Sequence, residues 1–424
     1  MMKKVVSLSL VAAMAGSLVA CGGGAGDTNT TAETKTEASA EKEESKAEAG
    51  AEKEESKAEG GSEETKEAAS GEGGSFKIGV IGPLTGDAAA YGLAVQHGAE
   101  IAAEEINAAG GINGAMIEIQ AQDDEADPEK SVNAYNTLKD WGMQILVGTT
   151  TSGACISVAA ETFADNMFQI TPSGSAVECV ANPNAFRVCF SDPDQGTASA
   201  KYIGENAMAT KVAIIYDSSS VYSDGIRETF VSEAANQGIE IVASEAFNGD
   251  NKTDFSVQLD KAKDAGAELV FLPIYYQEAS IILKQAADKE FKPIFFGVDG
   301  MDGILSVKNF DVSLAEGVML LTPFAADADD AKDFTTKYTE AYGETPNQFA
   351  ADAYDAVYAV AEAGKVAGIT PDMSYSDICN ALVPAMPQIT IDGLTGAGTT
   401  WNEAGEPNKA PKAVKIVGGK YEMQ

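Results

Sequence analysis

Hydroxyl-rich loops directly follow two of the strands expected in the first half of the chain. Residues 149–153 (TTTSG) follow a strand that ends at Gly148, and residues 171–175 (TPSGS) follow a strand through Ile170. Hydroxyl groups and free backbone N–H groups at a helix start can hold an anion such as a carboxylate without Arg or Lys. The alternative is that these Ser and Thr residues only cap the helices that follow.

Tyrosines and one acid occupy the equivalent places in the second half of the chain. Tyr222, Tyr275 and Asp299 each come shortly after a predicted strand. An acid that faces a carboxylate site across a cleft would complement an ammonium group, and tyrosine rings would cover the apolar part of a small zwitterion. The alternatives are tyrosines exposed in loops and an aspartate in a Gly-Val-Asp-Gly turn.

The composition excludes several other kinds of site. The 29 Lys and Arg residues against 65 Asp and Glu give a net charge of −36, which argues against nucleic acid as a partner. The single histidine, His97, lies in a helical pattern and is expected to be structural. We find no Gly-rich phosphate loop, no G-x-S-x-G elbow and no metal-ligand spacing, so we expect neither an enzyme, nor a metal, nor a cofactor.

Short apolar strands alternate with helical segments from Phe76 onward, which predicts an α/β fold. The alternation runs to about residue 171, is interrupted, and resumes at Val212. This pattern predicts two lobes, each a doubly wound parallel sheet, divided near residues 191–196 (SDPDQG). Two late helices, 331–342 and 347–363, have no strand between them, and they could return the chain to the first lobe.

The chain begins with the features of an exported lipoprotein. Two lysines precede an apolar run of residues 5–20, too short to span a bilayer, and residues 18–21 (LVAC) resemble a lipobox. We therefore expect residues 1–20 to be a signal peptide and Cys21 to carry the lipid; the alternative is an ordinary cleavage site with an accidental cysteine. Residues 21–74 lack aromatic and large aliphatic side chains and are expected to form a disordered acidic tether.

Four further cysteines follow, namely Cys155, Cys179, Cys189 and Cys379. Export permits disulfides, and Cys179 and Cys189 flank a short Ala-Asn-Pro-Asn turn. They are the first pair to test, although the sequence does not determine the pairing.

A set of motifs spread over residues 76–424 resembles one known family. They are residues 78–86 (IGVIGPLTG), 90–92 (AYG), 104–112 (EEINAAGGI), 123–124 (DD), 171–173 (TPS), 186–188 (FRV), 254–256 (DFS) and 353–356 (AYDA). Together they resemble the branched-chain amino acid (Leu/Ile/Val) substrate-binding proteins of ABC importers, which have the type I periplasmic-binding-protein fold.

The resemblance implies two lobes joined by three crossovers, which close on the ligand by a hinge. Residues 75–192 and 324–398 would form the N-terminal lobe, and residues 193–323 and 399–424 the C-terminal lobe. It further implies that Ser152 and Ser175 hold the ligand's α-carboxylate and that the Ser173 carbonyl faces the ammonium group. Asp299 would pair with the ammonium group, and the side-chain pocket would be lined by Tyr91, Tyr222 and Tyr275.

Asp299 stands where the family usually has Glu, and Ser175 replaces a commoner Thr, so which amino acid is preferred stays open. We expect a monomeric protein, lipid-anchored on the extracytoplasmic face of the cell membrane. It would bind a small, neutral aliphatic amino acid and deliver it to an ABC permease. Alternatives are import of a short amide, urea or an aromatic acid, and a ligand-sensing receptor component.

Overall fold

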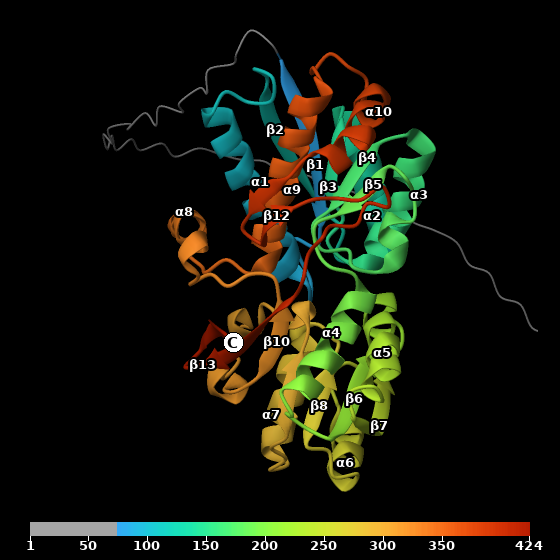
Figure 1. Ribbon diagram of the computed structural model, residues 1–424, viewed down its shortest axis with the longest axis vertical. Coiled ribbons are helices and arrows are strands. Elements are labelled where there is room, and N and C mark those ends of the chain that lie inside the picture. Colours follow the sequence, from blue (N-terminus) through green and yellow to red (C-terminus); the bar gives the residue numbers. More distant parts are fainter. Residues whose placement is uncertain (1–73) are drawn as a thin grey trace, which may run out of the picture. The chain divides into compact units, whose positions relative to one another are not determined.

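The computed structural model describes residues 74–424, and these belong to one compact unit. The expected signal peptide, Cys21 and nearly all of the acidic tether lie outside the described residues. Figure 1 shows two β-sheets with helices packed around each.

The first sheet has five parallel strands in the order β2-β1-β3-β4-β5. Its strands are β1 (Ser75–Gly82), β2 (Met116–Asp123), β3 (Ile145–Gly148), β4 (Phe168–Thr171) and β5 (Ala185–Arg187). The helices of this part, which we call lobe 1, are α1 (Ala89–Ala108), α2 (Pro128–Trp141), α3 (Ser152–Asp165), α9 (Gln348–Ala367) and α10 (Tyr375–Ala385). Strands β3 and β4 are entirely buried, which is typical of parallel strands covered by helices on both faces.

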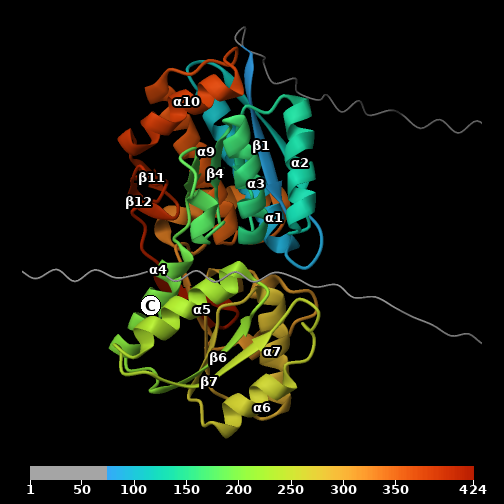
Figure 2. The ribbon, with the colours of Figure 1, turned by 90° about the vertical axis from the view of Figure 1, so that its right-hand side faces the viewer.

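The second sheet has seven strands in the order β14-β13-β10-β9-β8-β6-β7. They are β6 (Lys211–Asp217), β7 (Glu240–Phe247), β8 (Leu269–Leu272), β9 (Ile294–Gly297), β10 (Met319–Thr322), β13 (Lys412–Val417) and β14 (Lys420–Met423). Its helices are α4 (Asp192–Glu205), α5 (Val221–Ala234), α6 (Ser256–Asp264) and α7 (Tyr276–Asp288), and we call this part lobe 2. Helices α4 and α5 lie side by side (Figure 2).

The chain passes between the lobes more than once. It enters lobe 2 at α4 and returns after β10 through α8 (Lys332–Tyr342) to α9, which packs against α1. The hairpin β11 (Ile391–Gly393) and β12 (Gly396–Thr399) follows, and β11 contacts α9. Strands β13 and β14 then add an antiparallel edge to the second sheet. The late helices therefore do return the chain to lobe 1.

Local sequence signals explain where the helices begin and end. In α2 the Asp127 side chain accepts hydrogen bonds from the N–H groups of Glu129 and Lys130, and Pro128 occupies the first turn. The same helix ends at Gly142, which has a left-handed conformation (φ 96°) that suits glycine.

The α/β prediction is confirmed, but some element boundaries differ. Helix α3 begins at Ser152, inside the predicted loop 149–153 and not after it. The segment 191–196, predicted as an irregular division, instead starts α4, because Ser191 caps the helix and Pro193 fits its first turn.

The pair Cys179 and Cys189, the first candidate for a disulfide, is not bonded in this structure, in which all four described cysteines are free and buried. The Cys179 Sγ atom lies 3.7 Å from the Ser152 carbonyl oxygen, so this thiol points toward α3. His97 has a structural role: its ring stacks on that of Tyr342 with centroids 3.6 Å apart.

Membrane-spanning helices and metal-binding clusters are both absent from residues 74–424. No helix in this part of the chain is long and apolar enough to cross a membrane. No group of three or more His, Cys, Asp or Glu side chains there is arranged to hold a metal ion.

Candidate functional site

The two hydroxyl-rich loops meet at the carboxyl ends of β3 and β4. Ser152, the first residue of α3, accepts hydrogen bonds through Oγ from the N–H groups of Ser175 (3.1 Å) and Ala176 (3.2 Å). The Oγ atoms of Ser152 and Ser175 are 3.5 Å apart, and both residues are buried. The structure thus brings hydroxyls and backbone N–H groups together at a helix N-terminus, as an anion site requires.

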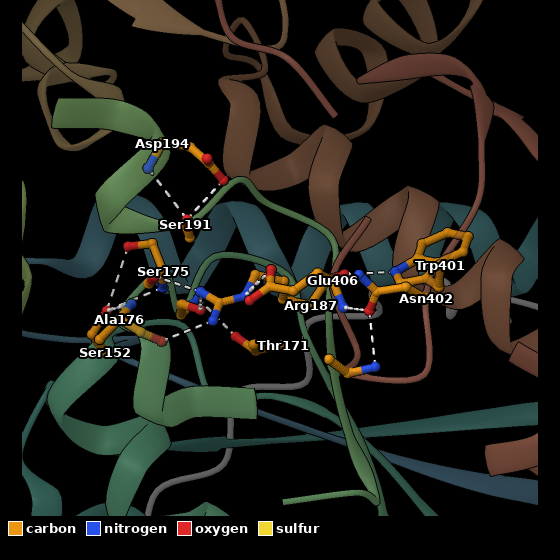
Figure 3. A network of polar contacts seen from close by, with 12 residues as sticks. Ser152, Thr171, Ser175, Ala176, Arg187, Ser191, Asp194, Trp401, Asn402 and Glu406 are labelled. Carbon is orange, nitrogen blue, oxygen red and sulfur yellow. Dashed lines mark hydrogen bonds and ion pairs between the residues drawn. The ribbon is translucent and has the colours of Figure 1, made fainter. Parts of the chain in front are cut away.

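A buried arginine holds the second of these loops in place (Figure 3). The Arg187 guanidinium donates hydrogen bonds to three successive carbonyl oxygens, those of Gly174 (3.2 Å), Ser175 and Ala176 (3.0 Å). Because the carbonyls bind the arginine, the N–H groups of the loop remain directed toward Ser152. We assign Arg187 a positioning role.

Arg187 is itself held by the segment that follows β12. Its Nε atom lies 3.0 Å from the Glu406 carboxylate, and its backbone carbonyl accepts a hydrogen bond from the Trp401 indole (2.7 Å). Since the Arg187 side chain is fully buried, these partners are needed to offset the cost of removing its charge from water. In the sequence, Arg187 stands out only as part of the family motif 186–188; a lone arginine in a buried strand is the signal that could have marked it.

Asp299 lies across the cleft, directly after β9 in lobe 2. Its Oδ1 atom accepts a hydrogen bond from the Tyr222 hydroxyl at 2.6 Å, and its N–H group donates to the Gln195 side-chain oxygen at 3.3 Å. Tyr222 also accepts a hydrogen bond from the Gly300 N–H group (2.9 Å). The Tyr222 hydroxyl thus holds the Asp299 carboxylate, and the other two hydrogen bonds hold the backbone beside it.

Burial raises the pKa of Asp299 from 3.8 to about 6, and the hydrogen bond from Tyr222 opposes the shift. A second buried acid, Asp192, has its pKa raised well above the ordinary value by burial, and the nearby Asp299 charge adds to this. A cation placed beside Asp299 would favour the charged form of both acids.

Aromatic rings enclose the space between the loops and Asp299. The Tyr91 ring packs edge-on against Tyr275, with centroids 5.3 Å apart, and lies 4.1 Å from the Phe349 ring. Tyr222 and Tyr275 are 5.2 Å apart. The cavity that these rings and the loops enclose is about 10 Å³, roughly the space that one water molecule needs.

Six of the seven predicted ligand-binding residues line this inner cavity: Tyr91, Ser152, Ser173, Tyr222, Tyr275 and Asp299. Ser175 is not in the lining but lies against Ser152 behind it. The lining residues that the sequence analysis did not single out for ligand binding are Thr150, Thr151, Gly300 and Phe349. Thr150 and Thr151 belong to the predicted loop, whereas Phe349 begins a late helix whose place in the fold periodicity alone did not determine.

Hydrogen bonds across the cleft connect the two lobes near the site. Tyr91 of α1 donates to the Gly300 carbonyl oxygen and accepts from the Tyr276 N–H group (3.3 Å). The Tyr276 hydroxyl in turn accepts from the Ala90 N–H group at the start of α1 (3.3 Å). These contacts hold the lobes together over the inner cavity.

The family model described as periplasmic binding protein matches residues 75–420. This chain belongs to the periplasmic binding protein family. Members of this family are substrate-binding proteins of transporters and not enzymes, so the prediction that the chain is not an enzyme is confirmed. The predicted likeness to branched-chain amino acid binding proteins of ABC importers is confirmed as well.

Curated relatives and solved structures support the family assignment. The chain is 30% identical over 357 residues to Leu/Ile/Val-binding protein homolog 1 of Brucella suis, covering 81% of this chain and 92% of that protein. A match to homolog 3 of Brucella melitensis, at 34% identity, spans 61% of that protein.

Two solved structures are similar over 82% of this chain. One is the substrate-binding protein LivJ of Streptococcus pneumoniae in complex with isoleucine, with 30% identity, a TM-score of 0.75 and 98% of that chain covered. The other is the leucine-binding protein LivK of Thermotoga maritima, with 25% identity, a TM-score of 0.73 and 97% of that chain covered. The type I periplasmic-binding-protein fold is therefore confirmed.

Proposed function

We propose that this periplasmic binding protein captures a neutral aliphatic amino acid of the branched-chain type between its lobes and delivers it to an ABC permease. The observation that carries the proposal is the opposition of an anion site in lobe 1, at Ser152 and Ser175, to the buried Asp299 in lobe 2. An α-amino acid is the small ligand that carries both complementary charges on one carbon.

Each group has a defined task in this proposal. The Ser152 hydroxyl holds the carboxylate, and Ser175 and the N–H groups of its loop support Ser152 from behind. Asp299 and the Ser173 carbonyl take the ammonium group. Tyr91, Tyr222, Tyr275 and Phe349 surround the side chain. Charge-assisted hydrogen bonds count for more once the lobes exclude water, and a few of them supply the about 8 kcal/mol of micromolar binding.

The ligand of the pneumococcal neighbour, isoleucine, supports this assignment. An aromatic acid, urea or a short amide lacks an ammonium group, and would leave the Asp299 carboxylate buried without a cation. The observations therefore favour an amino acid over these alternatives.

The proposal includes attachment to the membrane through a lipid on Cys21, with the folded part on the extracytoplasmic side. Metabolic labelling with a radioactive fatty acid tests this directly. Label is expected on the wild-type protein and not on a Cys21→Ser variant, and equal labelling of both would contradict lipid attachment.

A thermal-shift panel tests the ligand. Protein that has been unfolded, dialysed and refolded to remove ligand is heated with each of the amino acids, with urea, with acetamide and with benzoate. Leucine, isoleucine or valine are expected to raise the melting temperature most. Stabilisation by urea, acetamide or benzoate with none by any amino acid would overturn the assignment.

A further inference from the structure

A second, larger cavity adjoins the inner one at the mouth of the cleft. It measures about 590 Å³ and shares Thr151, Tyr222 and Tyr275 with the lining of the inner cavity. A long side chain of a ligand held by Asp299 and Ser152 could therefore extend into this larger cavity along the Tyr222 and Tyr275 rings. We call this space the outer chamber.

The outer chamber has an acidic lining. Four carboxylate side chains line it, those of Asp87, Glu125, Asp217 and Glu278, against a single ammonium group, that of Lys252. The carboxylates come from both lobes, with Asp87 and Glu125 on lobe 1. The chamber therefore favours a cationic or hydrogen-donating group over an anion.

Glu278 distinguishes the chamber from an ordinary acidic surface. Its side chain is only 7% exposed, and its Oε1 atom lies 3.2 Å from the Lys252 Nζ atom. Its Oε2 atom is buried and has no hydrogen-bond partner among the described residues. A buried carboxylate oxygen without a partner is costly, and a donor from a ligand would remove that cost.

The position of Glu278 on α7 links the chamber to the inner site. It lies in the first turn of α7, three residues after the N-cap residue Tyr275, and both residues line the outer chamber. Burial raises the pKa of Glu278, and the negative charge of Asp217 contributes to the increase. The Lys252 charge opposes this increase, and a further positive charge in the chamber would oppose it more.

We propose that the outer chamber binds the cationic end of a longer amino-acid side chain, such as that of lysine or arginine, through the Glu278 carboxylate. The methylene groups of that side chain would lie on the Tyr275 ring. This inference rests on the proposed function, because it requires the α-amino and α-carboxylate groups to be held in the inner site. It extends the range of ligands beyond aliphatic amino acids.

Paired ligands isolate the contribution of the charge. L-Norleucine and L-lysine have side chains of the same carbon length and differ in the terminal ammonium group. Titration calorimetry on ligand-stripped protein measures Kd for both, with L-leucine as reference. Glu278→Gln is expected to weaken the binding of lysine about tenfold relative to that of norleucine, because the substitution removes one charge-assisted hydrogen bond.

Two further variants complete the experiment. Glu205→Gln removes a negative charge from an exposed position at the end of α4 and controls for net charge. Lys252→Met removes the competing cation and is expected to strengthen the binding of lysine severalfold relative to that of norleucine. This variant also serves as the test if Glu278→Gln does not fold, as judged by its melting curve.

The outcomes separate this inference from the proposed function. The outer-chamber site alone would be overturned if leucine bound and lysine did not. It would also be overturned if neither Glu278→Gln nor Lys252→Met altered the affinity for lysine relative to that for norleucine. Failure of every amino acid to bind would overturn both proposals. The site would be supported if the affinity for lysine relative to that for norleucine fell in Glu278→Gln and stayed unchanged in Glu205→Gln.

Discussion

Asp299 connects the electrostatics of single residues to ligand binding. The carboxylate is buried and its pKa is about 6, so at neutral pH it is charged in a place that favours the neutral form. The free-energy cost of this buried charge has a function in binding, because a ligand ammonium group would pair with the charged form of Asp299. The buried charge of Asp299 therefore lowers the stability of the unliganded protein and raises its affinity for a ligand with an ammonium group.

The pH dependence of binding follows from this pKa. Leucine affinity is expected to be constant above about pH 7 and to fall as the pH decreases through 6, approaching tenfold per pH unit, because the proton competes with the ammonium group. Titration calorimetry between pH 5 and 8 measures the affinity for leucine. Asp299→Asn is expected to bind at least 100-fold more weakly and to lose most of this dependence; an unchanged pH profile in the variant would exclude Asp299 as the partner.

The Asp299→Asn substitution, which is expected to weaken binding, is expected to raise the stability of the unliganded protein. With a pKa of about 6 in the folded state against 3.8 unfolded, the folded protein binds more protons between these values. Stability therefore decreases as the pH rises through this window, by about 2–3 kcal/mol in total. Unliganded Asp299→Asn is expected to melt higher than the wild type at pH 7.5, and a lower melting temperature would contradict the cost assigned to the charge.

Arg187 is the residue whose replacement should most disturb the anion site without touching the ligand. In Arg187→Lys a single ammonium group cannot reach three carbonyls and Glu406 together. The free energy of unfolding is expected to fall by about 2–4 kcal/mol, measured by urea denaturation, with weaker leucine binding. The matched control is Arg227→Lys, at the only other arginine of the chain, which lies on the surface of α5. Equal losses in the two variants would contradict the positioning role.

At the scale of elements, the start of α1 and the start of α7 hold each other across the cleft. Tyr91 and Tyr276 each bind a backbone group of the opposite lobe, so both helices take part in closure. Because these bonds join hydroxyls to backbone groups, they depend little on pH near neutrality.

Removing one of these bonds is expected to weaken closure while keeping the packing. Tyr276→Phe loses the hydroxyl that accepts from the Ala90 N–H group, which is worth about 1 kcal/mol or about fivefold in affinity. Stopped-flow fluorescence should show the change mainly in the rate of leucine release. Tyr202→Phe, whose ring packs on Phe296 in lobe 2, is the control. A release rate unaffected by Tyr276→Phe would exclude the hydroxyl from closure.

At the scale of the whole molecule, the inner cavity requires the lobes to move. A space of about 10 Å³ cannot admit an amino acid, whereas the chain segments that pass between the lobes are suited to a hinge. The cleft must therefore open for a ligand to enter, and closure around an amino acid must leave more space at the inner cavity than the present closed form has.

Small-angle X-ray scattering on ligand-stripped protein tests this motion. The radius of gyration is expected to decrease when saturating isoleucine is added, because closure brings the lobes together. Proline, whose secondary amine offers fewer hydrogens to Asp299, serves as a comparison and is expected to produce a smaller change. Identical scattering with and without isoleucine, in a sample shown by calorimetry to bind it, would contradict hinge closure.

Much of this protein follows from its sequence alone. The alternation of apolar strands and helices predicted the α/β architecture. Polar residues after strands pointed to the loops 149–153 and 171–175 and to Tyr222, Tyr275 and Asp299, because parallel strands end at the same edge of a sheet. The individual serines within the loops came from the family resemblance. The tertiary structure alone decided the rest. Arg187 binds carbonyls 11 to 13 residues away and an acid 219 positions later, and Phe349 reaches the cavity from a late helix. Such contacts depend on how distant segments pack, which leaves no periodic signal in the chain.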